Sequence, residues 1–77
     1  MFAKLLGIME LNFKNSNGEQ VQGANIFVSY QDENVIGEKT DKFYVKKEIA
    51  IPEQIKIGDV LNISFNCKGK VEAITKK

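Results

Sequence analysis

Apolar and polar residues alternate along most of this chain, in short runs separated by turn-forming residues. The first run spans residues 4–14. Its alternate positions hold Leu5, Gly7, Met9, Leu11 and Phe13. A period of two residues is typical of a β-strand with one buried face. Gly7 lies inside this run, and a glycine there indicates a bulge or tight bend. We therefore predict a bent first strand with one apolar face.

The same alternation predicts four more strands, at about residues 21–31, 40–51, 60–66 and 71–75. Asn17-Gly18 is a pair that supplies the positive φ angles of a tight hairpin, and Lys68-Gly69 predicts another turn. Pro52 ends the third strand because it has no N–H to pair. No window of helical length has a clean helical period.

These elements predict an all-β fold, a small five-stranded OB-like barrel with a protruding hairpin arm at residues 31–40. Closure into a barrel is favoured because it removes sheet edges that a short chain has little means to cover. The predicted core combines the apolar faces of the strands. Its members are Leu5, Met9, Leu11, Ile26, Val28, Phe43, Val45, Leu61, Ile63 and Phe65.

Composition limits how such a domain can be stabilised. The 77 residues are 43% hydrophobic and 27% charged, which predicts one globular domain over residues 1–77. The only cysteine, Cys67, has no partner for a disulfide within the chain, and without histidine there is no usual zinc set. A thin core without these supports favours a homodimer. Val35 and Ile36, apolar residues in a polar arm, are the candidate contact.

Residues 1–10 do not read as a signal peptide, because Glu10 ends a short apolar run without a small-residue cleavage site. No segment reaches the roughly 20 apolar residues of a membrane span. With an unpaired cysteine, the expected location is the cytoplasm.

The chain has no histidine and no arginine, so all 11 positive charges are lysines. The usual catalytic base is therefore absent, and no serine has an activating partner at motif spacing. There is also no phosphate loop or dinucleotide fingerprint. We expect no catalytic residue, no metal, no cofactor and no small-molecule substrate.

The strongest functional pattern combines aromatic and basic residues. Lys42, Tyr44 and Lys46 alternate along one strand and therefore project from one face. Phe27 lies on the polar face of the preceding strand, so pairing through the arm brings it onto the face of Tyr44. Single-stranded nucleic acid is bound by such rings, on which bases stack, with cations along the backbone path.

Structural interpretations of these residues stay open as alternatives to binding. Phe27 also fits a position under a loop or in a dimer interface, and Tyr44 also fits a residue that only covers the sheet. The use of lysine and never arginine is also what an AT-rich gene produces.

Two segments resemble the gene V-type single-stranded DNA-binding proteins of filamentous phages. One is the strand–turn–strand segment of residues 13–23, ending in Gln22-Gly23, and the other is residues 55–65, ending in Ser64-Phe65. The resemblance implies an OB-like barrel, a symmetric dimer and sequence-tolerant binding of single-stranded DNA. The chain departs from that family in lacking arginine and in having an acidic arm. Its general character also resembles small proteins of phages and mobile elements in Gram-positive bacteria.

We therefore expect a non-enzymatic module that binds single-stranded nucleic acid through Phe27, Lys42, Tyr44 and Lys46. The alternative is a protein–protein interaction or assembly module of a phage or mobile element. Salt dependence separates the two, because phosphate contacts weaken steeply with salt and an apolar interface does not.

Overall fold

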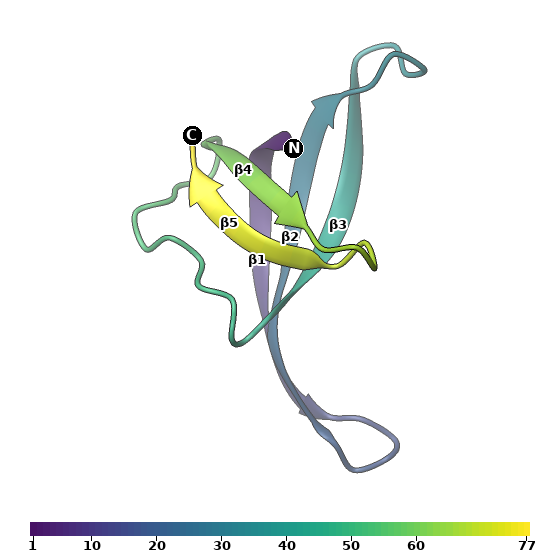
Figure 1. Cartoon of the computed structure of the whole chain (residues 1–77), viewed down its shortest axis with the longest axis vertical. Helices are drawn as coiled ribbons and strands as arrows, with labels where there is room; N and C mark the ends of the chain where they lie inside the picture. Colours follow the sequence, from purple (N-terminus) through teal and green to yellow (C-terminus); the bar gives the residue numbers. More distant parts are fainter.

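The computed structural model describes all of residues 1–77 and contains a single five-stranded antiparallel sheet without a helix (Figure 1). The strands are β1 (Phe2–Lys14), β2 (Gln20–Gln31), β3 (Glu38–Lys46), β4 (Val60–Phe65) and β5 (Val71–Lys76). Their order in the sheet is β3-β2-β1-β4-β5. The predicted all-β class and the number of strands are thus confirmed. No helix in the structure is long and apolar enough to cross a membrane.

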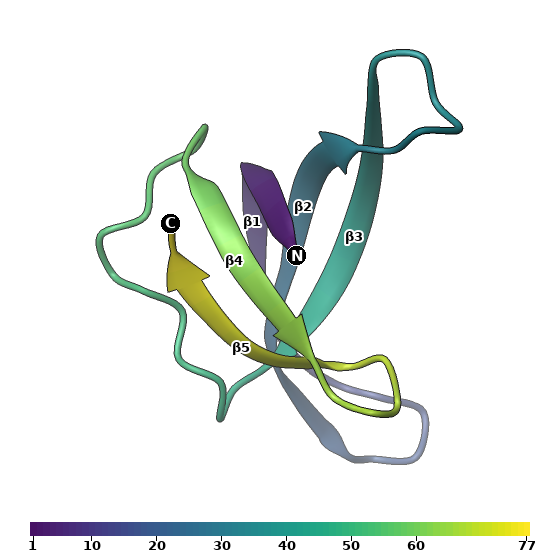
Figure 2. The ribbon, with the colours of Figure 1, turned by 45° about the horizontal axis from the view of Figure 1, so that its top comes forward.

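β1 is the central strand, and its two halves have different neighbours. It pairs with β2 from Lys4 to Lys14, but with β4 only from Phe2 to Lys4. The β1–β2 hairpin therefore projects beyond β4 and β5 (Figures 1 and 2). β3 ends at Lys46, earlier than predicted, because the chain turns back where the Ile49 N–H bonds to the Lys46 carbonyl.

A bulge lies in β1 where Gly7 predicted one. Leu5 is opposite Val28 and Gly7 is opposite Phe27, so Leu6 has no partner of its own in β2. An extra residue in one strand reverses the alternation of its side chains beyond that point. The prediction that Leu5, Gly7, Met9, Leu11 and Phe13 share one face is therefore wrong. Leu5 faces the core, whereas Gly7 and the residues that alternate after it face away.

The core is formed by side chains from all five strands. Its fully buried large side chains are Leu5, Ile26, Val28, Val45, Leu61 and Ile63, all predicted. Ala3, Val71 and Ile74 complete the cluster, and Phe43 and Phe65 pack at its edge, partly buried. Met9 was predicted to be buried and is 46% exposed, because the bulge turns it to the opposite face. Leu11 is half-buried for the same reason.

The sheet is open, although a closed barrel was expected. β3 and β5 are the two ends of the sheet and come into contact, but no hydrogen-bonded pairing joins them. The Phe43 and Phe65 rings meet edge to face with centroids 5.1 Å apart, and Ile49, Ile51 and Ile55 of the β3–β4 connection pack against the core.

Two hairpins use the same asparagine–glycine turn. The Asn15 side-chain oxygen accepts the N–H groups of Asn17 and Glu19, and Gly18 has a φ of 78°. In the β4–β5 turn, Asn66 and Gly69 have the same roles. The expected pair of positive φ angles at Asn17-Gly18 is wrong, since only the glycine has one. Asparagine side chains of this kind mimic a backbone turn, which leaves the positive φ to glycine alone.

Asp59 connects the β3–β4 segment to β1. Its carbonyl accepts the Leu5 N–H at 2.8 Å, and its carboxylate accepts the Lys56 N–H at 2.8 Å. The Lys56 N–H is the main reason that the pKa of Asp59 is lowered from its ordinary 3.8; partial burial opposes this, and Lys76, 3.4 Å away, adds to the lowering. Asp59 therefore favours the folded chain when ionised.

We expect Leu61→Ala and Ile63→Ala each to destabilise the fold by about 2–5 kcal/mol, because both remove fully buried side chains. Leu6→Ala is the matched control, since Leu6 is 42% exposed in the bulge. Thermal unfolding followed by circular dichroism measures all three. Melting curves that do not distinguish Leu61→Ala from Leu6→Ala would contradict this core.

The lowered pKa of Asp59 predicts a pH dependence of stability. A carboxyl group whose pKa is lower in the folded than in the unfolded chain stabilises the fold above the unfolded pKa, and that contribution is lost as the pH falls through the folded value. We expect the loss to occur below about pH 3.8, the ordinary value. Asp59→Asn should be less stable than wild type at neutral pH and should lose less stability on acidification. Denaturant unfolding at several pH values measures this, and equal acid slopes would contradict it.

Candidate nucleic-acid interface

The side of β1, β2 and β3 that faces away from the core forms a continuous surface, here called the outer face. Residues opposite each other in neighbouring antiparallel strands project from the same face. The register therefore places side chains in three cross-strand rows. They are Gly7–Phe27–Lys42, Met9–Asn25–Tyr44 and Leu11–Gly23–Lys46. All four predicted site residues, Phe27, Lys42, Tyr44 and Lys46, lie together here.

The Phe27 ring lies against Gly7 of the neighbouring strand. A Cβ atom at Gly7 would be 3.7 Å from Phe27 Cδ2, which is ordinary van der Waals contact. The side chain remains 36% exposed. An alanine methyl group would therefore fit beneath the ring, which packs beside β1 and keeps part of its surface in solvent.

The Tyr44 ring lies over Gly23 of the neighbouring strand. A Cβ atom at Gly23 would be 3.0 Å from Tyr44 Cε1, and the Tyr44 hydroxyl donates a hydrogen bond to the Gln22 carbonyl at 2.9 Å. Tyr44 is nevertheless 41% exposed. The hydroxyl end of the ring is thus held against the backbone of β2. Phe27 and Tyr44 are diagonal neighbours on this surface, since Phe27 is opposite Lys42 and Tyr44 is opposite Asn25.

Charge on the outer face is positive in its centre. Lys42 and Lys46 flank Tyr44 on β3, and the three rows contain no acidic side chain. The register adds Lys4 beside Ser29 at one end. The outer-face acid on β3 is Glu38, opposite Gln31 at the base of the arm. A cationic strip with this arrangement attracts an anionic chain.

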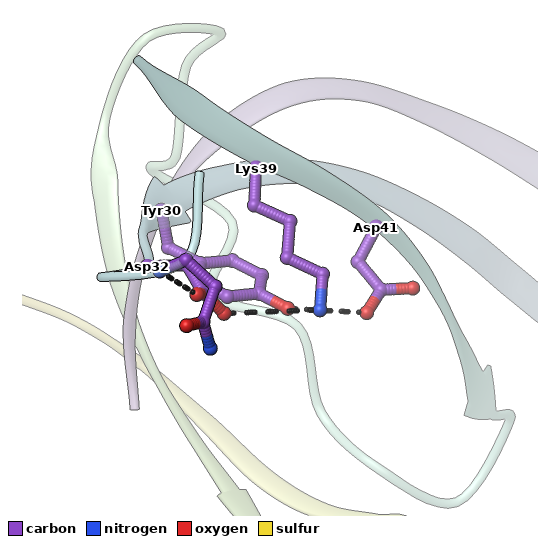
Figure 3. A network of polar contacts seen from close by, with 5 residues as sticks. Tyr30, Asp32, Lys39 and Asp41 are labelled. Carbon is purple, nitrogen blue, oxygen red and sulfur yellow. Dashed lines mark hydrogen bonds and ion pairs between the residues drawn. The ribbon is translucent and has the colours of Figure 1, made fainter. Parts of the chain in front are cut away.

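Two acids near the arm, Asp32 and Asp41, take part in a polar network with Tyr30 and Lys39 (Figure 3). Asp41 is opposite the buried Val28 and accepts a hydrogen bond from the Tyr30 hydroxyl at 3.3 Å. Lys39 lies 3.8 Å from the Asp32 carboxylate and 6.0 Å from the centre of the Tyr30 ring. Of the acids in the arm, Asp32 is thus paired with a lysine, whereas Glu38 lies on the outer face.

Val35 and Ile36 lie at the tip of the arm, where both side chains are exposed to solvent. Ile36 is fully exposed and Val35 is 37% exposed. The expected homodimer contact through these residues remains a prediction.

Shallow grooves lie on both sides of the β1–β2 hairpin. A groove of about 330 Å³ runs beside Tyr44 and Lys46, with Val21 and Gln22 on its other wall. A larger groove, of about 760 Å³, lies where Ala24 and Val45 meet the chain segment around Ile49. The smaller groove extends the outer face past its last row.

Sequence reasoning missed the apolar part of this surface. Met9 and Phe13 are 46% and 49% exposed, and both alternate with the residues that face away from the core after the bulge. Gly7 was the available signal, because a bulge at that position implies that the residues after it change face. The outer face is thus richer in apolar side chains than the four predicted residues alone.

No group of three or more cysteine, aspartate or glutamate side chains gathers in a way that would hold a metal ion. Cys67 is a free, exposed thiol in the β4–β5 turn. Comparison of the chain with protein-family models, with curated proteins and with solved structures found no match.

The two glycines beneath the rings form a matched pair for mutagenesis. We expect Gly23→Ala to destabilise the fold by about 1–3 kcal/mol, because the new methyl group would press on the Val45 carbonyl and on the Tyr44 ring. Gly7→Ala should cost less, since its methyl group meets Phe27 at an ordinary distance. Thermal unfolding measures both. Equal melting temperatures for the two variants would contradict the placement of Tyr44 over Gly23.

Proposed function

We propose that this chain binds single-stranded nucleic acid, with little sequence preference, on the outer face of β1, β2 and β3. One observation carries the proposal. Two partly exposed aromatic rings occupy diagonal positions in rows that contain no acid: Phe27 is opposite Lys42, and Tyr44 lies between Lys42 and Lys46 on β3. Aromatic platforms with flanking cations are the recurrent chemistry of single-strand binding.

The fixed position of Tyr44 favours stacking. A base stacked on an aromatic side chain contributes about 1–3 kcal/mol. An exposed side chain loses rotamer freedom when a ligand orders it, which reduces that gain. The hydrogen bond from Tyr44 to Gln22 and the contact with Gly23 already restrict this ring in the free protein. Less of the stacking free energy is then lost to ordering the side chain.

We further propose that the sheet is a partly open OB-like barrel. Its strand order leaves β3 and β5 at the two ends, and these two strands contact each other without hydrogen-bonded pairing. OB domains are five-stranded, are commonly incompletely closed, and bind oligonucleotides on the face of the second and third strands. Phe27 on β2 and the two lysines on β3 lie on the corresponding strands here.

The second candidate is a protein–protein or assembly module. The exposure of Met9 and Phe13 favours it, because large apolar side chains gathered on one face are typical of interaction surfaces. An interface of that kind would show little salt dependence, whereas nucleic-acid binding would weaken as salt rises.

We expect Tyr44→Ala to weaken binding of a fluorescently labelled single strand by about 1–3 kcal/mol, because it removes a stacking surface. Lys46→Ala should weaken binding less and reduce the slope of log K against log salt by about 0.7, the value for one lost phosphate contact. Fluorescence anisotropy titrations at several salt concentrations measure both effects.

Three conservative changes accompany this experiment. Tyr44→Phe keeps the ring and should retain most of the affinity. Glu38→Gln should tighten binding slightly by removing repulsion on the outer face, whereas Asp41→Asn makes the same change in charge on the opposite side and should tighten it less. Wild-type protein that shows no salt-sensitive binding to any single strand at low ionic strength would refute the proposal.

A further inference from the structure

The projecting part of β1 has a free edge. Beyond Leu5, one side of this strand pairs with β2, but no backbone group on the other side has a hydrogen-bond partner in the chain. The same stretch exposes large apolar side chains. They are Ile8 at 42%, Met9 at 46% and Phe13 at 49%. An open edge with apolar residues is a template for pairing with another strand.

The backbone groups on this edge follow from the hydrogen-bond pattern. Asn15 donates its N–H to the Glu19 carbonyl, so Asn15 and Glu19 form a hydrogen-bonded pair that closes the β1–β2 ladder at the turn. Such pairs alternate along an antiparallel ladder with pairs whose N–H and C=O groups point outward. The outward-pointing residues are therefore Ile8, Glu10, Asn12 and Lys14. Leu5 supports this assignment from the other side of the bulge, because its N–H and C=O bond to Asp59 and Gly58 rather than to β2.

We propose that a second copy of this chain pairs with the free edge of β1, antiparallel, with the two-fold axis beside Asn12. In this register Glu10 is opposite Lys14 of the second copy, and Lys14 is opposite its Glu10. Leu11 and Phe13 are likewise opposite Phe13 and Leu11 of the second copy. Opposite charges and apolar or aromatic side chains in directly opposing positions stabilise antiparallel pairs. The edge is thus complementary to itself, as a two-fold interface requires.

The length of the free edge selects this register. With the axis beside Asn12, Ser16 of the second copy lies opposite Ile8, so its turn begins where the free edge ends. An axis beside Leu11 would instead place Asn17 of the second copy opposite Leu5, whose outward N–H and C=O groups are already bonded within the chain. An axis beside Phe13 would leave Glu10 without an opposing lysine. With the axis beside Leu11, Glu10 would also be opposite Asn12 and Lys14 opposite Ile8, so neither charge would be matched. The pairing with Asn12 on the axis opposes Glu10, Asn12 and Lys14 to outward residues of the second copy and matches both charges.

The same pairing would extend the outer face. Two three-stranded surfaces would join into one six-stranded surface, with the exposed Phe13 side chains packed near its centre and the β3 lysines along both margins. The dimer is argued from β1 alone and stands whether or not the outer face binds nucleic acid.

Charge reversal at the two edge positions tests the register. Wild type should sediment as a dimer at high micromolar concentration. Glu10→Lys or Lys14→Glu alone should weaken dimerisation about tenfold, because each creates two like-charge contacts across the axis in place of two attractive ones. The double variant, Glu10→Lys with Lys14→Glu, should restore the wild-type dissociation constant to within about threefold, since the opposed charges are again complementary. Sedimentation equilibrium measures all four proteins.

Two control variants separate this interface from other contacts. Lys4→Glu makes the same change in charge on β1 outside the free edge and should leave dimerisation unchanged. Ile36→Asp alters the tip of the arm and should also leave it unchanged. A monomeric wild type, a double variant as weak as the single ones, or loss of the dimer through Ile36→Asp alone would each overturn the proposal. Circular dichroism spectra of every variant exclude unfolding as the cause of dissociation.

Discussion

The unpaired residue Leu6 in β1 is the feature on which the rest of the structure depends. Before it, β1 is a central strand whose side chains Ala3 and Leu5 belong to the core and whose backbone bonds to the β4 side. After it, the strand pairs only with β2, and its side chains have exchanged faces. One extra residue thus ends the core, frees an edge and places Met9 and Phe13 on the same surface as Phe27 and Tyr44.

Glycine has a second role on that surface. Gly23 leaves room for the ring of Tyr44 from the neighbouring strand, so that this ring lies on backbone rather than standing away from the sheet. A side chain of any size at Gly23 would conflict with the Val45 carbonyl and with the ring. The position of this ring therefore depends on two residues together, the tyrosine and the glycine beneath it. A sequence in which only the aromatic residues were retained would not reproduce it.

Sequence reasoning predicted the strands well because apolar residues alternate along the core faces of β2 and β4, and Ile26, Val28, Leu61 and Ile63 are fully buried as expected. It placed Phe27, Lys42, Tyr44 and Lys46 on one face for the same reason. It failed for β1, because a bulge can be inferred from a glycine while its effect on the later residues requires the pairing partner to be known. It also predicted a closed barrel, which depends on how two strand ends meet in space rather than on any local pattern.

The lack of a core beneath the β1–β2 hairpin has a dynamic consequence. From Leu6 to Gly23 no residue is fully buried, so little apolar contact opposes the opening of this segment. Regions of this kind exchange their amide hydrogens through local opening rather than through global unfolding. Gly23 and Gln22, on which Tyr44 rests, belong to this segment. A ligand bound to the outer face would consequently order the hairpin. Conversely, a contact that orders the hairpin would lower the entropy cost of binding on the outer face. The two events are therefore linked through the conformational entropy of one segment.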